Sequence, residues 1–186
     1  QAFRDIVLKR NQDALRKSGE NENIFPFESA HNQILARLSQ ADYTFKLGIS
    51  LVLRNSASGD LLRHEMAIEA GILQQLSTRE TSTCAVFGDW DYLSHQVIAS
   101  PLKPIDYMDK MDLFGYSYVA GFKPTKSRFL VAEIKKDAAK IEDVDQLLKY
   151  VDWVRDEYCF GDYSMVNAFL VAYDFDKAVI DHARRV

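Results

Sequence analysis

Cysteine and proline are scarce in this chain of 186 residues, which contains two cysteines and four prolines. Cys84 and Cys159 stand far apart without a C-x-x-C motif, so the sequence predicts neither a disulfide framework nor a zinc ribbon. No apolar run approaches the length of a membrane span, and the charged N-terminus lacks the apolar core of a signal peptide. We therefore expect a cytoplasmic, intracellular protein with no membrane partner.

Several motifs of known chemistry are also missing. The four histidines form no H-x-x-x-H pair. The sequence contains no G-x-x-x-x-G-K-[ST] loop and no G-x-S-x-G elbow, which disfavours ATP-driven and serine-hydrolase chemistry. The first residue is not Met, which is compatible with a fragment of a longer chain.

An excess of basic residues is absent as well, because the net charge is −4. This balance argues mildly against a generic DNA-binding protein, although a local basic surface can act within an acidic chain. The alternative for such a cluster is an ordinary solvated loop and strand end. The candidate basic residues are Lys123, Lys126, Arg128, Lys135, Lys136 and Lys140.

The apolar share of 47% is ordinary for a globular protein, and the length suits one sizeable domain. The order of the predicted helices and strands indicates an α/β fold with a mixed sheet between helices. Residues 43–53 fit either an extended segment or a short helix. Apolar periodicity and turn residues predict helices at about 3–17, 28–40, 60–77, 142–157 and 175–185, the third capped by Ser58 or Asp60 and the last by Asp174. They predict strands at 81–87, 111–119, 129–136 and 167–173, and a further short element at 92–99.

The stretch 129–136, F-L-V-A-E-I-K-K, has the composition of a buried strand but carries two charges. Because side chains alternate along a strand, Glu133 and Lys135 point the same way. Ionised groups are costly to bury unless they are paired or bind a metal. The pair is therefore either a partly buried ion pair or part of a site for a cation and a phosphate.

Two further acids lie in apolar surroundings. Glu69 falls on the helical stripe of Met66 and Leu73, and Glu65, on the neighbouring stripe, is its rival. Asp112 lies in the predicted strand 111–119, which forms a hairpin with the strand of Glu133.

Two other acids, Asp89 and Asp91, are alternatives to Asp112 as a metal-binding aspartate. They follow the predicted strand at 81–87 in the turn G-D-W-D. Trp90, within that turn, and Trp153 are expected to pack rather than to stack on bases.

The order Glu69, Asp112 and then Glu133 with Lys135 is followed by a helix with Gln146 and Tyr150 four residues apart. This order resembles the PD-(D/E)xK nuclease superfamily. The Gln-x-x-x-Tyr step resembles its RecB-type branch. The resemblance covers residues 58–186 and implies a restriction-endonuclease-like mixed central sheet flanked by helices. Residues 1–57 would form a helical N-terminal extension. Two departures are Met111, where the family often has Pro, and a long Asp112–Glu133 interval that the loop at Pro124 explains.

The resemblance implies a DNA endonuclease of restriction or repair type, from a prokaryote, that uses Mg²⁺ or Mn²⁺. It implies DNA as the partner and a homodimer, because two copies can cut two strands. The metal ligands would be Asp112, Glu133 and the carbonyl of Ile134, with Glu69 binding directly or through water. Lys135 would act on the attacking water or on the phosphate.

Gln146 and Tyr150 would position Lys135 or contact the DNA backbone. Two alternatives stay open at this point. One is a non-catalytic DNA-binding or assembly module that keeps the nuclease fold, and the other is a hydrolase of nucleotides or RNA.

Overall fold

The structure is a computed structural model that describes residue 47 and residues 56–58, 61–99 and 109–186. The predicted helices at 3–17 and 28–40 lie outside the described residues. The extension predicted for residues 1–57 therefore stays a prediction. No helix in the described part of the chain is long and apolar enough to cross a membrane.

A four-stranded sheet forms the centre of the molecule, in the order β3-β4-β5-β7. The strands β3, β4 and β5 are antiparallel neighbours, whereas β5 and β7 are parallel. This mixed pairing confirms the predicted mixed sheet. The bounds of the strands are Tyr92–Ile98 for β3, Lys110–Tyr118 for β4, Lys126–Ile134 for β5 and Val166–Val171 for β7.

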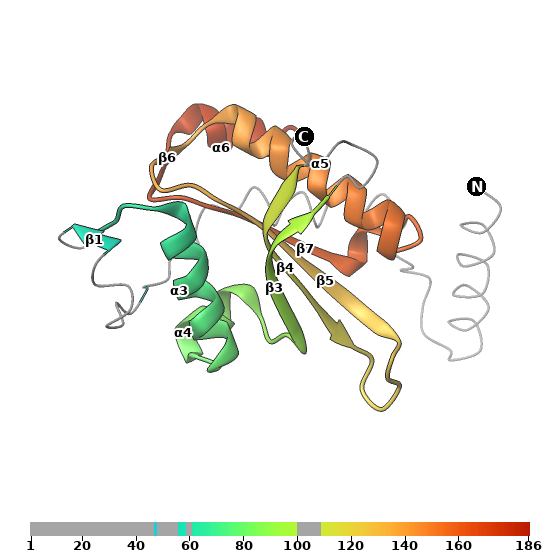
Figure 1. The fold of residues 1–186 in the computed structure, drawn as a ribbon. Coiled ribbons are helices and arrows are strands. Elements are labelled where there is room, and N and C mark those ends of the chain that lie inside the picture. The colour runs from blue at the N-terminus through green and yellow to red at the C-terminus, as the bar shows by residue number, and fades with distance from the viewer. Residues whose placement is uncertain (1–46, 48–55, 59–60, 100–108) are drawn as a thin grey trace, which may run out of the picture.

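Helices cover both faces of this sheet (Figure 1). The helices α5 (Ile141–Tyr158) and α6 (Lys177–Ala183) lie on one side, and α3 (Glu65–Ser77) and α4 (Thr81–Phe87) lie on the other. The arrangement confirms the predicted fold class, a mixed central sheet flanked by helices. The remaining described elements are short: β1 (Ala57–Ser58), β2 (Leu61–Leu62), β6 (Ala138–Ala139), a 3₁₀ turn (Tyr163–Met165) and β8 (Asp174–Phe175).

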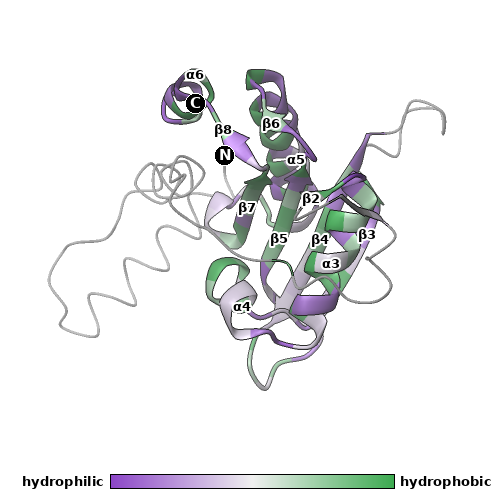
Figure 2. Ribbon diagram, turned by 90° about the vertical axis from the view of Figure 1, so that its left-hand side faces the viewer, coloured by the Kyte–Doolittle hydropathy of each residue, from purple (hydrophilic) through white to green (hydrophobic). Residues whose placement is uncertain are grey.

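Strand β5 contributes to two hydrophobic cores at once. Phe129 and Val131 join the core beneath α5, whereas Leu130, Ala132 and Ile134 join the core beneath α3 and α4. Successive side chains point to opposite faces of a strand, so a strand covered on both faces is apolar nearly throughout. Figure 2 shows the hydrophobic colouring along β5 in the middle of the molecule. Within the buried part of β5, residues 129–134, Glu133 is the exception to this rule, which makes its surroundings informative.

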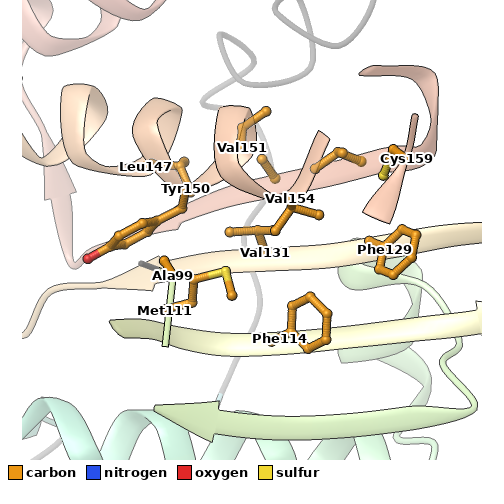
Figure 3. Close-up of a cluster of buried hydrophobic side chains, with 12 residues drawn as sticks. Ala99, Met111, Phe114, Phe129, Val131, Leu147, Tyr150, Val151, Val154 and Cys159 are labelled. Atoms are coloured by element: carbon orange, nitrogen blue, oxygen red, sulfur yellow. The ribbon is translucent and has the colours of Figure 1, made fainter. Parts of the chain in front are cut away.

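The core beneath α5 is closed by the inner face of that helix (Figure 3). Leu147, Tyr150, Val151 and Val154 are all buried and pack against Val131 and its neighbours. Their spacing of three and four residues places them on one side of the helix. The predicted helix at 142–157 is therefore confirmed, with its apolar stripe directed at the sheet.

The strand predicted at 81–87 is wrong, because these residues form the helix α4. Its β-branched and aromatic residues favour a strand in isolation. However, the Glu80 carboxylate accepts a hydrogen bond from the Thr83 amide at 2.8 Å and so caps the helix. Thr83 and Phe87, four residues apart, are both buried, so tertiary packing favours the helical spacing here.

Two helix starts also differ from the prediction. Helix α3 begins at Glu65 with His64 as N-cap, rather than near residue 60 after Ser58 or Asp60. Helix α6 is capped by Asp176, whose carboxylate accepts from the Val179 amide at 2.8 Å, rather than by Asp174. Short strands occupy the positions where both helices were predicted to start.

The buried stripe of α3 is also not the predicted one. Met66 is 64% exposed, whereas Ile68, Ile72 and Leu76 are buried at spacings of four residues. Glu69 is buried nevertheless, beside this stripe rather than on it. The helix is apolar on more than one side, so the sequence alone did not decide which stripe faces the sheet.

Candidate active site

The side chain of Glu133 lies almost completely buried near the end of β5, with the residue 2% exposed. One carboxylate oxygen, Oε1, accepts a hydrogen bond from the Lys135 ammonium at 2.6 Å. The other, Oε2, is buried and has no hydrogen-bond partner within the described part of the chain. Burial raises the pKa of Glu133 to about 7; the Lys135 hydrogen bond opposes the shift, and the negative charge of Asp112 adds to it.

Asp112 lies on the neighbouring strand β4, next to Glu133 in register. The pairing of Leu113 with Ala132 sets this alignment. The Asp112 oxygen Oδ2 accepts from the Ile134 amide at 2.7 Å, which fixes the carboxylate at the end of the hairpin. Burial raises the pKa of Asp112, and the hydrogen bonds from Ile134 and Gln96 reduce that rise. Two carboxylates with raised pKa values thus lie side by side.

Gln96 connects Asp112 with the acid on α3. Its side-chain nitrogen Nε2 lies 3.0 Å from Asp112 Oδ1 and 3.2 Å from each carboxylate oxygen of Glu69. The backbone of Gln96 has a φ of 52°, and the β3–β4 pairing skips this residue. A positive φ is uncommon for a residue with a side chain, so the amide is held here at a conformational cost.

The sequence did not indicate a role for Gln96. A glutamine in a short element carries no charge and belongs to no motif that the pattern of acids defines. The irregularity of β3 at this residue appears only once the strand is paired with β4.

Glu69 is 3% exposed, and burial raises the pKa of its carboxyl, opposed by the hydrogen bonds from Gln96. The His95 nitrogen Nδ1 lies 3.6 Å from Glu69 Oε2. Glu65, the alternative helical acid, is less buried than Glu69. Its carboxylate accepts a hydrogen bond from the amide of Lys136, just beyond β5, at 3.3 Å. Both helical acids therefore face the end of the hairpin, and Glu69 is the one that shares Gln96 with Asp112.

Lys135 lies between two acids. Its ammonium nitrogen is 2.6 Å from Glu133 Oε1 and 3.5 Å from Asp143 Oδ1 in the first turn of α5. Burial lowers the pKa of Lys135, but the hydrogen bond to Glu133 and the charges of both acids together raise it above its ordinary value. Lys135 is therefore a cation at neutral pH in this arrangement. Asp143 was not singled out from the sequence, since acids are common in the first turn of a helix.

Gln146 and Tyr150 form a pair on α5. The Gln146 amide donates to the Tyr150 hydroxyl at 2.7 Å. Tyr150 is 1% exposed, and burial raises its pKa to about 12, with the nearby charge of Glu133 as a further raising cause. In Figure 3 its hydroxyl oxygen lies at the end of the core opposite Phe129. Neither residue forms a hydrogen bond with Lys135 within the described region, so their predicted positioning role stays a prediction.

The alternative aspartates lie elsewhere. The Asp91 carboxylate accepts from the Tyr118 amide at 2.8 Å, and the Asp89 carbonyl accepts from Arg128 at 2.7 Å. Tyr118 is six residues from Asp112 on the same strand, which is about 20 Å at the rise of an extended chain. Asp89 and Asp91 therefore belong to the opposite end of the hairpin from Glu133.

No group of three or more His, Cys, Asp and Glu side chains is arranged to hold a metal ion among the described residues. The contacts explain why no such group forms, because the carboxylates of the candidate site are hydrogen-bonded to donors of the protein. Gln96 lies between Glu69 and Asp112, and Lys135 is bonded to Glu133. The donor set still suits a hard cation, since carboxylate and carbonyl oxygens are its preferred ligands and the buried Glu133 Oε2 has no partner in the described ranges.

Comparisons with known proteins add little to this geometry. No protein-family model matches the sequence, and no curated protein sequence matches it. The crystal structure of a repair endonuclease from Pyrococcus abyssi is similar at a TM-score of 0.38 and 20% sequence identity. The similarity covers 61% of this chain and 42% of that chain, less than half of its length. A TM-score of this size does not identify a fold or an activity.

Proposed function

We propose that this chain is a metal-dependent nuclease that hydrolyses DNA phosphodiester bonds by attack of an activated water. The observation that carries the proposal is the buried Oε2 of Glu133, which has no hydrogen-bond partner among the described residues. It lies beside Asp112 on the adjacent strand and near Lys135, two residues further along the chain. A buried carboxylate oxygen without a partner is costly, and a bound cation would offset that cost. Clustered groups with strongly perturbed pKa values are also typical of functional sites.

The residues that would hold Mg²⁺ or Mn²⁺ are Asp112, Glu133 and the carbonyl of Ile134, with Glu69 binding directly or through water. When bound, the ion would supply charge neutralisation at the phosphate and lower the pKa of a coordinated water. The Ile134 amide fixes the Asp112 carboxylate by donating to its second oxygen, which leaves Oδ1 to Gln96 or to another ligand. The position of the Asp112 carboxylate is thus set by the backbone amide of Ile134 as well as by the side chain of Gln96.

Lys135 would act at the phosphate. Because its pKa is raised, it carries a positive charge at neutral pH and is a poor general base. A fixed cation next to a phosphate stabilises the negative charge that develops on the phosphoryl oxygens during the reaction. The Glu133 and Asp143 carboxylates hold the ammonium in place at 2.6 Å and 3.5 Å.

A supercoiled plasmid assay tests the proposal, because a closed circle reports internal cleavage without requiring an end. We expect nicked or linear products with Mg²⁺ or Mn²⁺ and none with EDTA. Asp112→Asn, Glu133→Gln and Lys135→Met should each reduce the rate by about 100-fold or more. Glu157→Gln, an isosteric change at an exposed acid at the far end of α5, is the matched control. Equal cleavage by wild type and Asp112→Asn would refute the proposal.

One observation favours a second candidate, a non-catalytic DNA-binding or assembly module with the same fold. Gln96 and Lys135 already occupy the carboxylates that a metal would need. Calorimetric titration with Mn²⁺ separates the two functions. Binding that Asp112→Asn abolishes supports the nuclease, whereas a silent titration together with an inactive plasmid assay supports the module.

The proposal extends to assembly. A single site of this kind cuts one strand at a time, so a homodimer would allow cleavage of both strands of a duplex. Sedimentation of the chain with and without a short duplex tests this extension. A monomer under both conditions, combined with nicked but not linear plasmid, would limit the enzyme to single-strand cuts.

A further inference from the structure

The end of the hairpin remote from Glu133 carries a cluster of aromatic rings. The Tyr92 and Tyr116 rings are stacked, with centroids 4.7 Å apart and planes inclined by 11°. The Tyr118 ring meets the Tyr116 ring edge-on, with centroids 5.3 Å apart. The Tyr116 ring also meets the Phe129 ring edge-on, and Phe129 in turn stacks on Tyr158 with centroids 5.6 Å apart. Tyr92 is 44% exposed and Tyr158 is 38% exposed, so two of these rings are open to solvent.

Two lysines lie on the same rings. The Lys126 ammonium is 4.3 Å from the centroid of Tyr116 and 5.7 Å from that of Tyr158. The Lys123 ammonium is 4.9 Å from the centroid of Tyr118. Neither lysine forms a salt bridge with an acid in the part of the chain that the structure describes. We call this group the tyrosine–lysine surface; its members are Tyr92, Tyr116, Tyr118, Lys123, Lys126 and Tyr158.

The six basic residues singled out from the sequence are thus divided among different surroundings. Arg128 lies over the Trp90 ring at 4.7 Å and donates to the Asp89 carbonyl. Lys135 belongs to the candidate active site, Lys136 pairs with Asp137, and Lys140 is the N-cap of α5. Of the six, Lys123 and Lys126 lie over tyrosine rings of this cluster, which are half-buried in Tyr116 and Tyr118 and exposed in Tyr158. The two cations are therefore a local feature of a chain whose net charge is −4.

Aromatic rings with lysines that lack acidic partners match the chemistry of an unpaired nucleic-acid strand. Each base offers a face for stacking, and each phosphate offers a charge for an ammonium. In a duplex the base faces are already stacked on one another, so the rings would have no role. The Asp91 carboxylate, which accepts a hydrogen bond from the Tyr118 amide, is an acid beside this surface and makes binding more dependent on both lysines.

We propose that the tyrosine–lysine surface binds an unpaired DNA strand through base stacking and phosphate contacts. The choice of DNA rests on the nuclease function proposed above. Tyr116 lies four residues from Asp112 on β4, which corresponds to about 13 Å of extended strand. A strand held at the tyrosine–lysine surface would therefore lie beside the candidate active site, and the substrate would have single-stranded character near the cut.

Fluorescence anisotropy in EDTA tests this proposal, since the absence of divalent metal separates binding from cleavage. The probes are a labelled 15-nucleotide oligo(dT) and a labelled duplex of equal length. We expect tighter binding of the single strand, and a loss of about tenfold or more in Lys123→Gln/Lys126→Gln. The salt dependence should fall by about 1.4 in the slope of log K against log salt, because two phosphate contacts are removed.

The double variant Lys177→Gln/Arg184→Gln is the matched control, as it removes two exposed cations on and just after α6. We expect it to bind the oligonucleotide like the wild type. Tyr92→Leu tests the stacking contribution while keeping apolar volume, and a loss of about fivefold or more is expected. Circular dichroism melting confirms that each variant is folded before its affinity is compared.

Equal oligonucleotide binding by wild type and Lys123→Gln/Lys126→Gln would overturn the proposal. Tighter binding of the duplex than of the single strand would overturn it too, as would no binding of either probe. The plasmid assay keeps the two proposals apart. Single-strand binding without any cleavage supports the tyrosine–lysine surface and refutes the nuclease, whereas cleavage with no effect of the lysines on affinity does the reverse.

Discussion

The two ends of the β4–β5 hairpin are built from opposite chemistry. At one end, buried carboxylates lie close together and their pKa values are raised by burial. At the other end, tyrosines and lysines that are half-buried or exposed interact through the faces of the tyrosine rings. The first arrangement has a high energetic cost and, in the proposed function, would bind a cation, whereas the second has a low cost and would bind unpaired bases. One end of the hairpin would thus carry out the proposed reaction, and the other end would bind the substrate.

The largest expected effect separates these two roles. Asp112→Asn should abolish cleavage, with a loss of about 100-fold or more, while the affinity for oligo(dT) in EDTA stays within about twofold. Lys123→Gln/Lys126→Gln should weaken affinity but leave the rate unchanged at saturating DNA. Single-turnover kinetics and anisotropy on the same preparations measure both quantities. If Asp112→Asn loses affinity as strongly as rate, the two ends do not act separately.

The second effect concerns the pH dependence of stability. The pKa of Glu133 is raised to about 7 in the folded chain, so the folded state binds a proton more tightly than the unfolded state. The contribution of Glu133 to the free energy of unfolding is fully present below its unfolded pKa of about 4.5. This contribution is lost as the pH rises through the folded pKa of about 7. Over this window the free energy of unfolding should fall by up to about 3 kcal/mol because of Glu133.

Urea unfolding at pH 5 and pH 8 measures this contribution. Glu133→Gln cannot titrate, so its decrease over the same window should be smaller than that of the wild type by up to about 3 kcal/mol. Glu157→Gln, at an exposed acid, should keep the wild-type decrease. An identical pH dependence in wild type and Glu133→Gln would show that the buried carboxyl is not the group responsible.

The contrast between the two ends also explains what could be predicted from the sequence. The apolar run with Glu133 was visible because a charge in such a strand is unusual. The fold class was predicted because strand and helix patterns in residues 110–186 are strong. The register of β4 against β5 then places Asp112 beside Glu133, as the hairpin prediction required.

Three features could not be predicted, for separate physical reasons. The helix α4 depends on a cap from Glu80 and on burial of Thr83 and Phe87, which override the strand preference of its residues. The buried stripe of α3 is one of several apolar sides, and only packing selects it. Gln96 acts through a positive φ that has no signature in the identity of a glutamine.

A third, smaller effect is expected at Gln96. Gln96→Ala removes the donor shared by Glu69 and Asp112 and leaves buried carboxylate oxygens without a partner. The free energy of unfolding at pH 7 should fall by about 1–3 kcal/mol. Gln74→Ala, at an exposed position of α3, is the control and should change it by less than about 0.5 kcal/mol. Equal losses in the two variants would mean that the bridging amide contributes nothing measurable.

The smallest effect is expected at the exposed end of the hairpin. The Lys126 ammonium lies over three rings at 4.3 Å, 5.7 Å and 5.7 Å, but the residue is only half-buried. Lys126→Gln should therefore lower the free energy of unfolding by at most about 1 kcal/mol, as for other exposed cation–π contacts. Urea unfolding of Lys126→Gln and of the control Lys177→Gln measures this loss of free energy. A loss as large as that of Gln96→Ala would show that the tyrosines and lysines are held together for stability, and the affinity of this end for DNA would then be secondary to folding.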